Sequence, residues 1–488
     1  MFLHFIDNLY ILSLQDNRSI TMIIRFTAIL VLLTAVLQAK PAFDEFFTNQ
    51  TMRVDYIHSG TGRTETFAVD EIYIEPVWAG STKNLVDTLN LGKYLFEVYD
   101  VRTNQLVYSR GFCSIFGEWQ TTDEAKSRRR AFSESIRFPN PRDKVKISIS
   151  SRDDNNIFMK RWAFPVDPSK ANIRRARFYE DLKVTDILDS GEPAQKVDVL
   201  ILPDGYTEKQ MKKFIKDAKK MCDVLFETSP FKERKTDFNI RALHLPSNEP
   251  GIDNPRKGIY RDNALSCSFN SFESDRYILT WDNKSVTKAA SAVPWDHLYI
   301  LVNSNKYGGG GIFNLYSTCI SDNEWSGYIF VHEFGHSFGG LGDEYYTSDV
   351  AYDEFYKPGV EPWEPNITAS TDIKSLKWNN LLEQGTPVPT PWDKAIYDST
   401  NRANRKTINL LSGKAAKDSV KAVHDQWRRD FLRAQEYWGK VGVFEGSGYA
   451  SEGLYRPYLD CRMFSRSLTG FDPVCLRALE RMIDFYTE

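Results

Sequence analysis

The chain has 488 residues, more than one hydrophobic core usually supports, so two domains are expected. Its apolar and charged fractions of 42% and 26% are typical of a globular protein. Lys and Arg number 62 against 65 Asp and Glu, and this net charge of −3 gives no reason to expect a nucleic acid or an anionic membrane as partner.

The N-terminus carries a short apolar run. Residues 26–37 (FTAILVLLTAVL) follow Arg25 and end near a small residue, which is the pattern of a secretory signal peptide. The run is too short to span a bilayer comfortably, and no other stretch approaches its length, so we expect no membrane span. We predict translation from Met22, removal of residues 1–39, and a mature protein that is secreted or periplasmic.

Six cysteines are too few for a disulfide scaffold in a chain of this length. An oxidising compartment permits some pairing, and Cys461 and Cys475 are the pair closest in sequence. The alternative is that the cysteines are free and buried, where they behave as small apolar side chains.

The segment 40–166 is expected to be a small β-sandwich domain, because short stretches alternate apolar and polar residues between turn signals. A polar break at Thr103–Gln105 predicts a hairpin loop. The polar segment 166–176 is a plausible boundary. The predicted strands are 70–78, 94–100, 106–112 and 144–151.

From 177 to 488 the pattern changes to a mixed α/β (α+β) domain. The apolar run 197–202 predicts a strand that ends in a turn at Pro203–Asp204–Gly205. Thr207 and Gln210 have capping-box spacing at the start of an amphipathic helix. At the other end of the domain, Asp472 is expected to cap a final helix.

Two more strand candidates, 297–303 and 312–319, flank four consecutive glycines at Gly308–Gly311. The glycines fit a flexible surface loop. They also fit a strand beside a substrate cleft, where the absence of side chains lets another backbone approach closely. A phosphate-binding loop is a poor alternative, because no Lys-Ser/Thr follows the glycines.

The segment 328–346 (YIFVHEFGHSFGGLGDEYY) carries the chemistry. His332 and His336 are four residues apart, which on a helix places both imidazoles on one face, where they can bind one zinc ion. Glu333 is then placed to act as general base on a water without being a ligand. A core helix with a stray histidine pair is the alternative.

A catalytic zinc needs a third protein ligand and an open position. Gly339, Gly340 and Gly342 should end the helix directly after the histidines, and a sharp turn there can bring Asp343 back to the metal. Glu354 is the rival, if a second helix supplies the carboxylate. The glycine cluster favours Asp343.

Met463 lies in a polar stretch, 455–464, that predicts a tight turn. In metzincin peptidases a methionine turn lies beneath the zinc site. On its own Met463 is better explained as an ordinary core residue, so it supports a methionine turn only if the zinc site is present.

These motifs resemble the M64 family of metallopeptidases, named for the immunoglobulin A peptidase of gut bacteria. The resemblance rests on 332–346, 198–207 (DVLILPDGYT), 307–314 (YGGGGIFN), 453–463 (GLYRPYLDCRM) and 473–483. It implies a zincin or metzincin-like catalytic fold with His332, His336 and Asp343 as ligands, Glu333 as general base, and a small N-terminal domain. Gly342 stands where metzincins have their third ligand, so the turn to Asp343 is one residue longer.

The expected protein is therefore a secreted zinc endopeptidase that hydrolyses extracellular proteins, with immunoglobulin A as one candidate substrate. Tyr345, Tyr346 and Tyr455 are candidates for stabilising the oxyanion. Two alternatives stay open. One is a zinc peptidase that acts on mucin or cell-wall peptides. The other is a secreted protein that binds a glycan or glycoprotein and carries a structural zinc.

Overall fold

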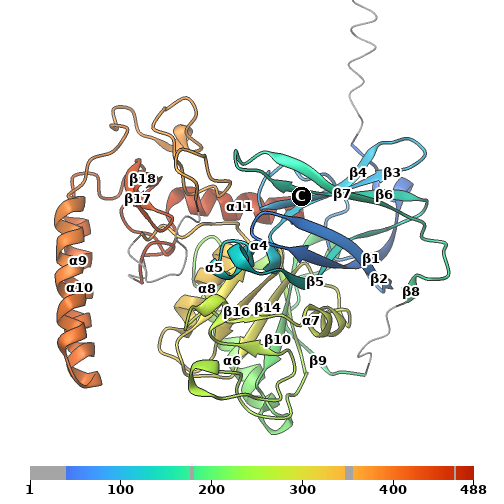
Figure 1. The fold of residues 1–488 in the computed structure, drawn as a ribbon, viewed down its shortest axis with the longest axis horizontal. Coiled ribbons are helices and arrows are strands. Elements are labelled where there is room, and N and C mark those ends of the chain that lie inside the picture. Colours follow the sequence, from blue (N-terminus) through green and yellow to red (C-terminus); the bar gives the residue numbers. More distant parts are fainter. Residues whose placement is uncertain (1–39, 176–180, 347–355, 467–468) are drawn as a thin grey trace, which may run out of the picture. The chain divides into compact units, whose positions relative to one another are not determined.

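The computed structural model describes residues 40–175, 181–346, 356–466 and 469–488, so the expected signal peptide and Glu354 lie outside the described residues. Residues Phe43–Glu488 pack into one unit (Figure 1). Within the described ranges no helix is both long and apolar enough to cross a bilayer.

Two four-stranded sheets form the N-terminal part, with strand orders β5-β1-β2-β8 and β4-β3-β6-β7. Buried residues of both sheets, among them Val54, Tyr56, Val98 and Ile147, make one hydrophobic core. The first sheet contains β1 (Phe47–Gly60), β2 (Glu65–Glu75), β5 (Arg130–Pro141) and β8 (Arg174–Arg175). The second contains β3 (Tyr94–Asp100), β4 (Leu106–Phe112), β6 (Val145–Arg152) and β7 (Phe158–Val166). Short helices lie at α3 (Phe43–Phe46), α4 (Ile115–Trp119) and α5 (Asp123–Ser127).

The predicted strands and hairpin are present in this part. Strands β3 and β4 pair antiparallel, and the Asp100 N–H donates to the Gln105 carbonyl (3.0 Å) across the expected loop. Strand β2 begins five residues earlier than predicted, since the polar stretch before Asp70 also pairs with β1.

The second part is built on a six-stranded sheet in the order β15-β16-β14-β10-β11-β9. Its four central strands are parallel: β16 (Tyr316–Ile320), β14 (His297–Val302), β10 (Val197–Asp204) and β11 (Phe238–Leu243). The outer strands β15 (Gly309–Ile312) and β9 (Val184–Leu188) pair antiparallel with their neighbours. Every residue of β10 and β14 is buried, as expected for parallel strands covered on both faces.

Two sequence expectations about these strands need correction. Strand β10 runs through Pro203 and Asp204, and the turn comes at Gly205, whose φ is +71°. The predicted strand 312–319 is shorter, because three of the four glycines themselves form the edge strand β15.

The helices of the second part follow the predicted start signals. Thr207 and Gln210 form the capping box ahead of α6 (Met211–Phe226). Asp472 caps α11 (Pro473–Thr487), and its side chain accepts from Val474 and Cys475. The remaining helices and strands are α7 (Asn283–Ala290), α8 (Ser326–Ser337), α9 (Lys394–Leu410), α10 (Lys414–Arg433), β12 (Cys267–Ser268), β13 (Leu279–Thr280), β17 (Phe444–Ser447) and β18 (Ala450–Arg456). Short 3-10 helices lie at Pro193–Gln195, Glu208–Gln210, Lys235–Asp237, Pro255–Lys257, Ser271–Glu273 and Asn379–Leu381.

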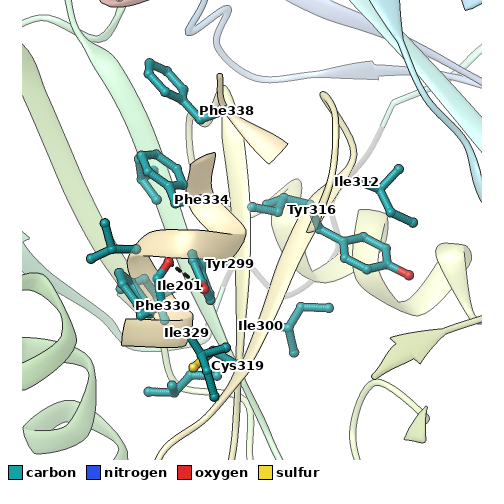
Figure 2. Packing of buried hydrophobic residues seen from close by; sticks show 14 of the residues in the cluster. Ile201, Tyr299, Ile300, Ile312, Tyr316, Cys319, Ile329, Phe330, Phe334 and Phe338 are labelled. Carbon is teal, nitrogen blue, oxygen red and sulfur yellow. Dashed lines mark hydrogen bonds between the residues drawn. The ribbon is translucent and has the colours of Figure 1, made fainter. Parts of the chain in front are cut away.

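Helix α8 packs on the sheet through aromatic side chains (Figure 2). Phe330 stacks on Tyr299 of β14 with ring centroids 4.0 Å apart, and the Tyr299 hydroxyl donates to the Phe330 carbonyl (3.0 Å). Phe334 and Phe338 stack on each other along the same face. The helix is therefore fixed on the sheet, and the side chains on its other face have fixed positions.

Candidate active site

Helix α8 carries His332, Glu333 and His336, as the sequence predicts. The Nε2 atoms of His332 and His336 are 3.2 Å apart, and the two rings are almost perpendicular. The spacing of four residues has placed both imidazoles on one face of the helix, with their Nε2 atoms converging on one point.

The chain turns back directly after the helix. Gly340 has a φ of +64°, the Gly340 N–H donates to the His336 carbonyl, and the Leu341 N–H donates to the Gly335 carbonyl. The bond from Gly340 to His336 is that of an αL C-cap, which needs a left-handed residue at the position of Gly340. The turn brings Asp343 Oδ1 to 3.2 Å from His332 Nε2 and 3.3 Å from His336 Nε2.

The Nδ1 atom of each histidine is hydrogen-bonded to a backbone carbonyl. His332 Nδ1 lies 3.1 Å from the Arg462 carbonyl, and His336 Nδ1 lies 2.6 Å from the Leu341 carbonyl. A carbonyl only accepts hydrogen bonds, so both Nδ1 atoms carry the proton and both Nε2 atoms present a lone pair in the neutral ring.

These three atoms fit a zinc ion. In a tetrahedron with zinc–nitrogen and zinc–oxygen bonds of about 2.0–2.1 Å, neighbouring donors lie about 3.3–3.4 Å apart. The observed triangle has sides of 3.2, 3.2 and 3.3 Å. A shared proton would shorten one side only, whereas three equal sides are what a central cation produces. Histidine and carboxylate are also donors that zinc accepts.

The loop that carries Asp343 is held by residues distant in sequence. Asn366, which is fully buried, accepts from the Gly342 N–H (2.8 Å) and donates to the Gly342 carbonyl (2.9 Å). The Tyr449 hydroxyl donates to Asp343 Oδ2, and the Gly448 N–H donates to the Asp343 carbonyl (3.0 Å). Oδ1 is thereby turned toward the histidines.

Met463 lies under the same loop. Its carbonyl accepts from the Glu344 N–H (2.9 Å), and the whole residue is buried. A methyl group built on Gly335 of α8 would lie 3.1 Å from the Met463 sulfur, so the side chain contacts the helix one residue before His336. Met463 therefore supports both the ligand helix and the ligand loop.

Glu333 faces the same hollow as the histidines. Burial raises the pKa of its carboxyl above the ordinary value, against the opposing charges of His332 and His336. Burial alone would also raise the pKa of Asp343, but the two histidines hold it well below its usual value, so Asp343 is ionised. The ionised Asp343 is thus suited to binding a cation, and Glu333, with its raised pKa, is suited to exchanging a proton.

The glycines of β15 have a structural use besides the one expected. A side chain on Gly309 would lie 2.6 Å from an Ile329 methyl, and one on Gly311 would lie 2.4 Å from the Glu333 carbonyl. The glycines therefore let the edge strand pack directly against α8. Part of the strand's outer edge is already occupied, because Gly309 exchanges hydrogen bonds with Arg276 and Ile278.

By alternation, the next outward-facing backbone groups on this edge belong to Gly311, which lines the hollow. The N-terminal part contributes Glu118 to the lining, and burial raises the pKa of that carboxyl to about 7. Arg276, Tyr307 and Phe313 lie along the same surface.

The three tyrosines named as oxyanion candidates lie in different places. Tyr345 lines the hollow. The Tyr346 hydroxyl donates to Asp398 (2.8 Å), and Tyr455 packs against a separate cluster of buried residues around Trp378. Only Tyr345 of these three described residues therefore faces the histidines' hollow.

Sequence reasoning missed Tyr449, Asn366 and Glu118. Nothing in the spacing of Tyr449 or Asn366 marks them, because they reach Asp343 through the fold from segments 23 or more residues away. Glu118 comes from the N-terminal part, and no local pattern links it to α8.

Two histidines and a glutamate on helix α8, with an aspartate from the loop that follows, have the chemistry that a metal-dependent hydrolase requires. The sequence pattern of the family described as IgA Peptidase M64 matches residues 185–483, and that of the Peptidase M64 N-terminus matches residues 42–163. The chain belongs to the M64 peptidase family, whose members are metallopeptidases. A search among curated proteins gave no match.

Proposed function

We propose that the protein is a zinc-dependent endopeptidase in which His332, His336 and Asp343 hold the metal and Glu333 is the general base. The observation that carries the proposal is the equal-sided triangle of donor atoms, 3.2–3.3 Å on each side, at the floor of a hollow that Glu333 also lines. A zinc ion bound there supplies a Lewis acid for the peptide carbonyl and lowers the pKa of a water toward about 7.

The remaining chemistry belongs to the chain. Glu333 accepts the proton of the attacking water and returns it to the leaving amine, and its raised pKa suits both steps. The two Nδ1–H bonds to backbone carbonyls keep the imidazoles in the required tautomer. The outward backbone groups of Gly311 pair with an extended substrate, and of the three tyrosines expected from the sequence Tyr345 is the one that lines the hollow and is proposed to donate to the oxyanion.

The fold supports this assignment. Two sheets around one core support a β-sandwich for the N-terminal domain, and a helix with the ligand pair against a mixed sheet supports a zincin-like catalytic domain. Met463 beneath the loop supports a methionine turn. A structural zinc at the histidine pair is less well supported, because such a site is normally closed by four protein ligands, and among the described residues only His332, His336 and Asp343 converge there.

The substrate is proposed to be an extracellular protein, because the apolar run 26–37 favours export. Immunoglobulin A is the first candidate to test, since the family takes its description from it. Mucin-type glycoproteins and cell-wall peptides are the comparison substrates.

The decisive experiment compares the wild-type protein with Glu333→Ala on unfolded casein, immunoglobulin A and mucin, with the products read by mass spectrometry. We expect the variant to keep its fold and bound zinc and to lose about 10²–10⁴-fold in kcat/KM. Wild-type activity in Glu333→Ala would refute the role of this glutamate. One zinc with no cleavage of any substrate by the wild type would refute the peptidase assignment.

A further inference from the structure

A second group of metal-binding side chains lies behind the ligand loop. Glu344, Cys461, Asp472 and Cys475 each offer one donor atom, and these atoms all lie within 4.8 Å of one another. All four residues are buried, with relative solvent-accessible areas of 0%, 0%, 3% and 0%. They come from the loop after α8, from the methionine turn and from the start of α11.

The two cysteines are not in a disulfide, contrary to the pairing considered from their spacing. Their sulfur atoms are 3.8 Å apart, whereas a disulfide bond is about 2.05 Å long. The observed sulfur–sulfur distance instead agrees with two cysteines that bind the same metal ion. Two thiolates on one tetrahedral zinc, with zinc–sulfur bonds of about 2.3 Å, lie about 3.8 Å apart.

The two carboxylates are placed to hold a cation between them. One oxygen of each is used: Glu344 Oε1 accepts from Asn366 (2.9 Å) and from the Cys475 thiol (3.2 Å), and Asp472 Oδ1 caps α11. The second oxygen of each, Glu344 Oε2 and Asp472 Oδ2, is buried without a donor from another described residue, and the two carboxyl groups interact with each other. Two facing carboxylates in a dry interior are costly unless a cation or a shared proton lies between them.

Burial and the two neighbouring carboxylates raise the pKa of both thiols well above the ordinary value, so their deprotonation requires a bound cation, and two local features lower its cost. The N–H groups of Met463 (3.5 Å) and Asp472 (3.4 Å) both point at the Cys461 sulfur. Cys475 sits in the first turn of α11, where the helix dipole favours a negative charge. Both features lower the cost of deprotonating the two cysteines, which metal binding requires.

We propose that Glu344, Cys461, Asp472 and Cys475 form a second, structural site for zinc. The donor set is closed and buried, as structural sites are, whereas the histidine site opens into the hollow. Glu344 follows Asp343 directly, and its N–H is bonded to Met463. The second ion therefore joins the ligand loop, the methionine turn and α11 at one point, and it positions Asp343 without touching substrate.

The test is the metal content of the full chain, purified without chelators and measured by mass spectrometry of the elements. We expect two zinc ions per chain in the wild type, one in His336→Ala and one in Cys475→Ser. Cys222→Ser changes a buried cysteine of α6 outside the group and should leave two. Because His336→Ala removes the first site, its remaining zinc tests this proposal even if the chain proves not to be a peptidase.

X-ray absorption of the His336→Ala protein uses the native cysteines, so it does not depend on Cys475→Ser folding. We expect zinc–sulfur scattering at about 2.3 Å. His336→Ala without zinc, or with zinc that has no sulfur neighbour, would overturn the proposal. So would a wild-type protein with one zinc and a Cys461–Cys475 disulfide seen by intact mass.

Discussion

The contact between the edge strand β15 and helix α8 gives a sharp prediction for Gly311→Ala. The new methyl group would lie 2.4 Å from the Glu333 carbonyl and 3.0 Å from the Cβ of His336. Ordinary contacts begin near 3.4 Å, so strand and helix have to separate by about 1 Å. The Glu333 carbonyl cannot move freely, because it also accepts from the Ser317 hydroxyl (3.0 Å).

A displacement of about 1 Å at a catalytic group costs about 10²-fold in rate, and overpacking of this kind costs about 1–3 kcal/mol of unfolding free energy. We expect Gly311→Ala to lose about 10²-fold in kcat/KM on a fluorogenic peptide while it remains folded by circular dichroism. Zinc content should be measured on the same samples, to separate misplaced ligands from a misplaced Glu333.

Gly327→Ala is the matched control, since it adds the same methyl group to the same helix at the end away from the histidines. There the nearest atoms are two methyl groups of the half-buried Val224 at 3.2 Å, which can shift slightly. The control should keep wild-type kcat/KM. Full activity in Gly311→Ala, with strand and helix unmoved in its crystal structure, would refute the reasoning.

Two further predictions concern residues around the ligands. Tyr449→Phe removes the hydroxyl that donates to Asp343 Oδ2, so zinc affinity should fall about 10–100-fold in a competitive chelator titration. His297 is buried behind α8 against Phe338, and burial lowers its pKa from 6.5 to about 3. The unfolded chain therefore binds the proton first as the pH falls below 6.5, and the folded state loses about 1.4 kcal/mol per pH unit down to about pH 3. Between pH 6.5 and pH 5 the wild type should lose about 2 kcal/mol more unfolding free energy than His297→Phe, measured in urea.

Each of these has a control and a contradicting outcome. Tyr260 is largely exposed, so Tyr260→Phe should bind zinc like the wild type. An unchanged affinity in Tyr449→Phe would mean that Asp343 is oriented without its hydroxyl partner. Parallel pH profiles for the wild type and His297→Phe would mean that this histidine titrates alike in both states.

The local part of the site was predictable from the sequence. His332 and His336 follow from helical spacing, and Asp343 follows from the glycines that end the helix, because both depend on neighbours in the chain. Tyr449 and Asn366 were not predictable, since their partners are set by the tertiary fold. The packing of Gly311 against α8 was not foreseen for the same reason: the sequence predicts a close backbone approach at these glycines, and only the structure shows that α8 makes one.

The fold, like the site, has elements that the local sequence predicts and elements that depend on tertiary contacts. Strands β10 and β14 were predictable because buried parallel strands are continuously apolar. Strand β1 was not singled out, because it buries Arg53 and Asp55, and only the fold reveals their ion pair (2.9 Å). Helices α9 and α10 were missed, since each is strongly polar on average and buries one residue.

The order of residues along the chain has a consequence for biosynthesis. All three proposed metal ligands lie between His332 and Asp343, yet the groups that hold Asp343 in place lie at Asn366, Tyr449 and Met463. A ribosome releases the ligands first, Asn366 shortly afterwards, and Tyr449 and Met463 more than a hundred residues after Asp343. A nascent or C-terminally truncated chain that ends before Tyr449 therefore contains every proposed ligand without two of the groups that hold Asp343, and we expect such a chain to bind zinc weakly.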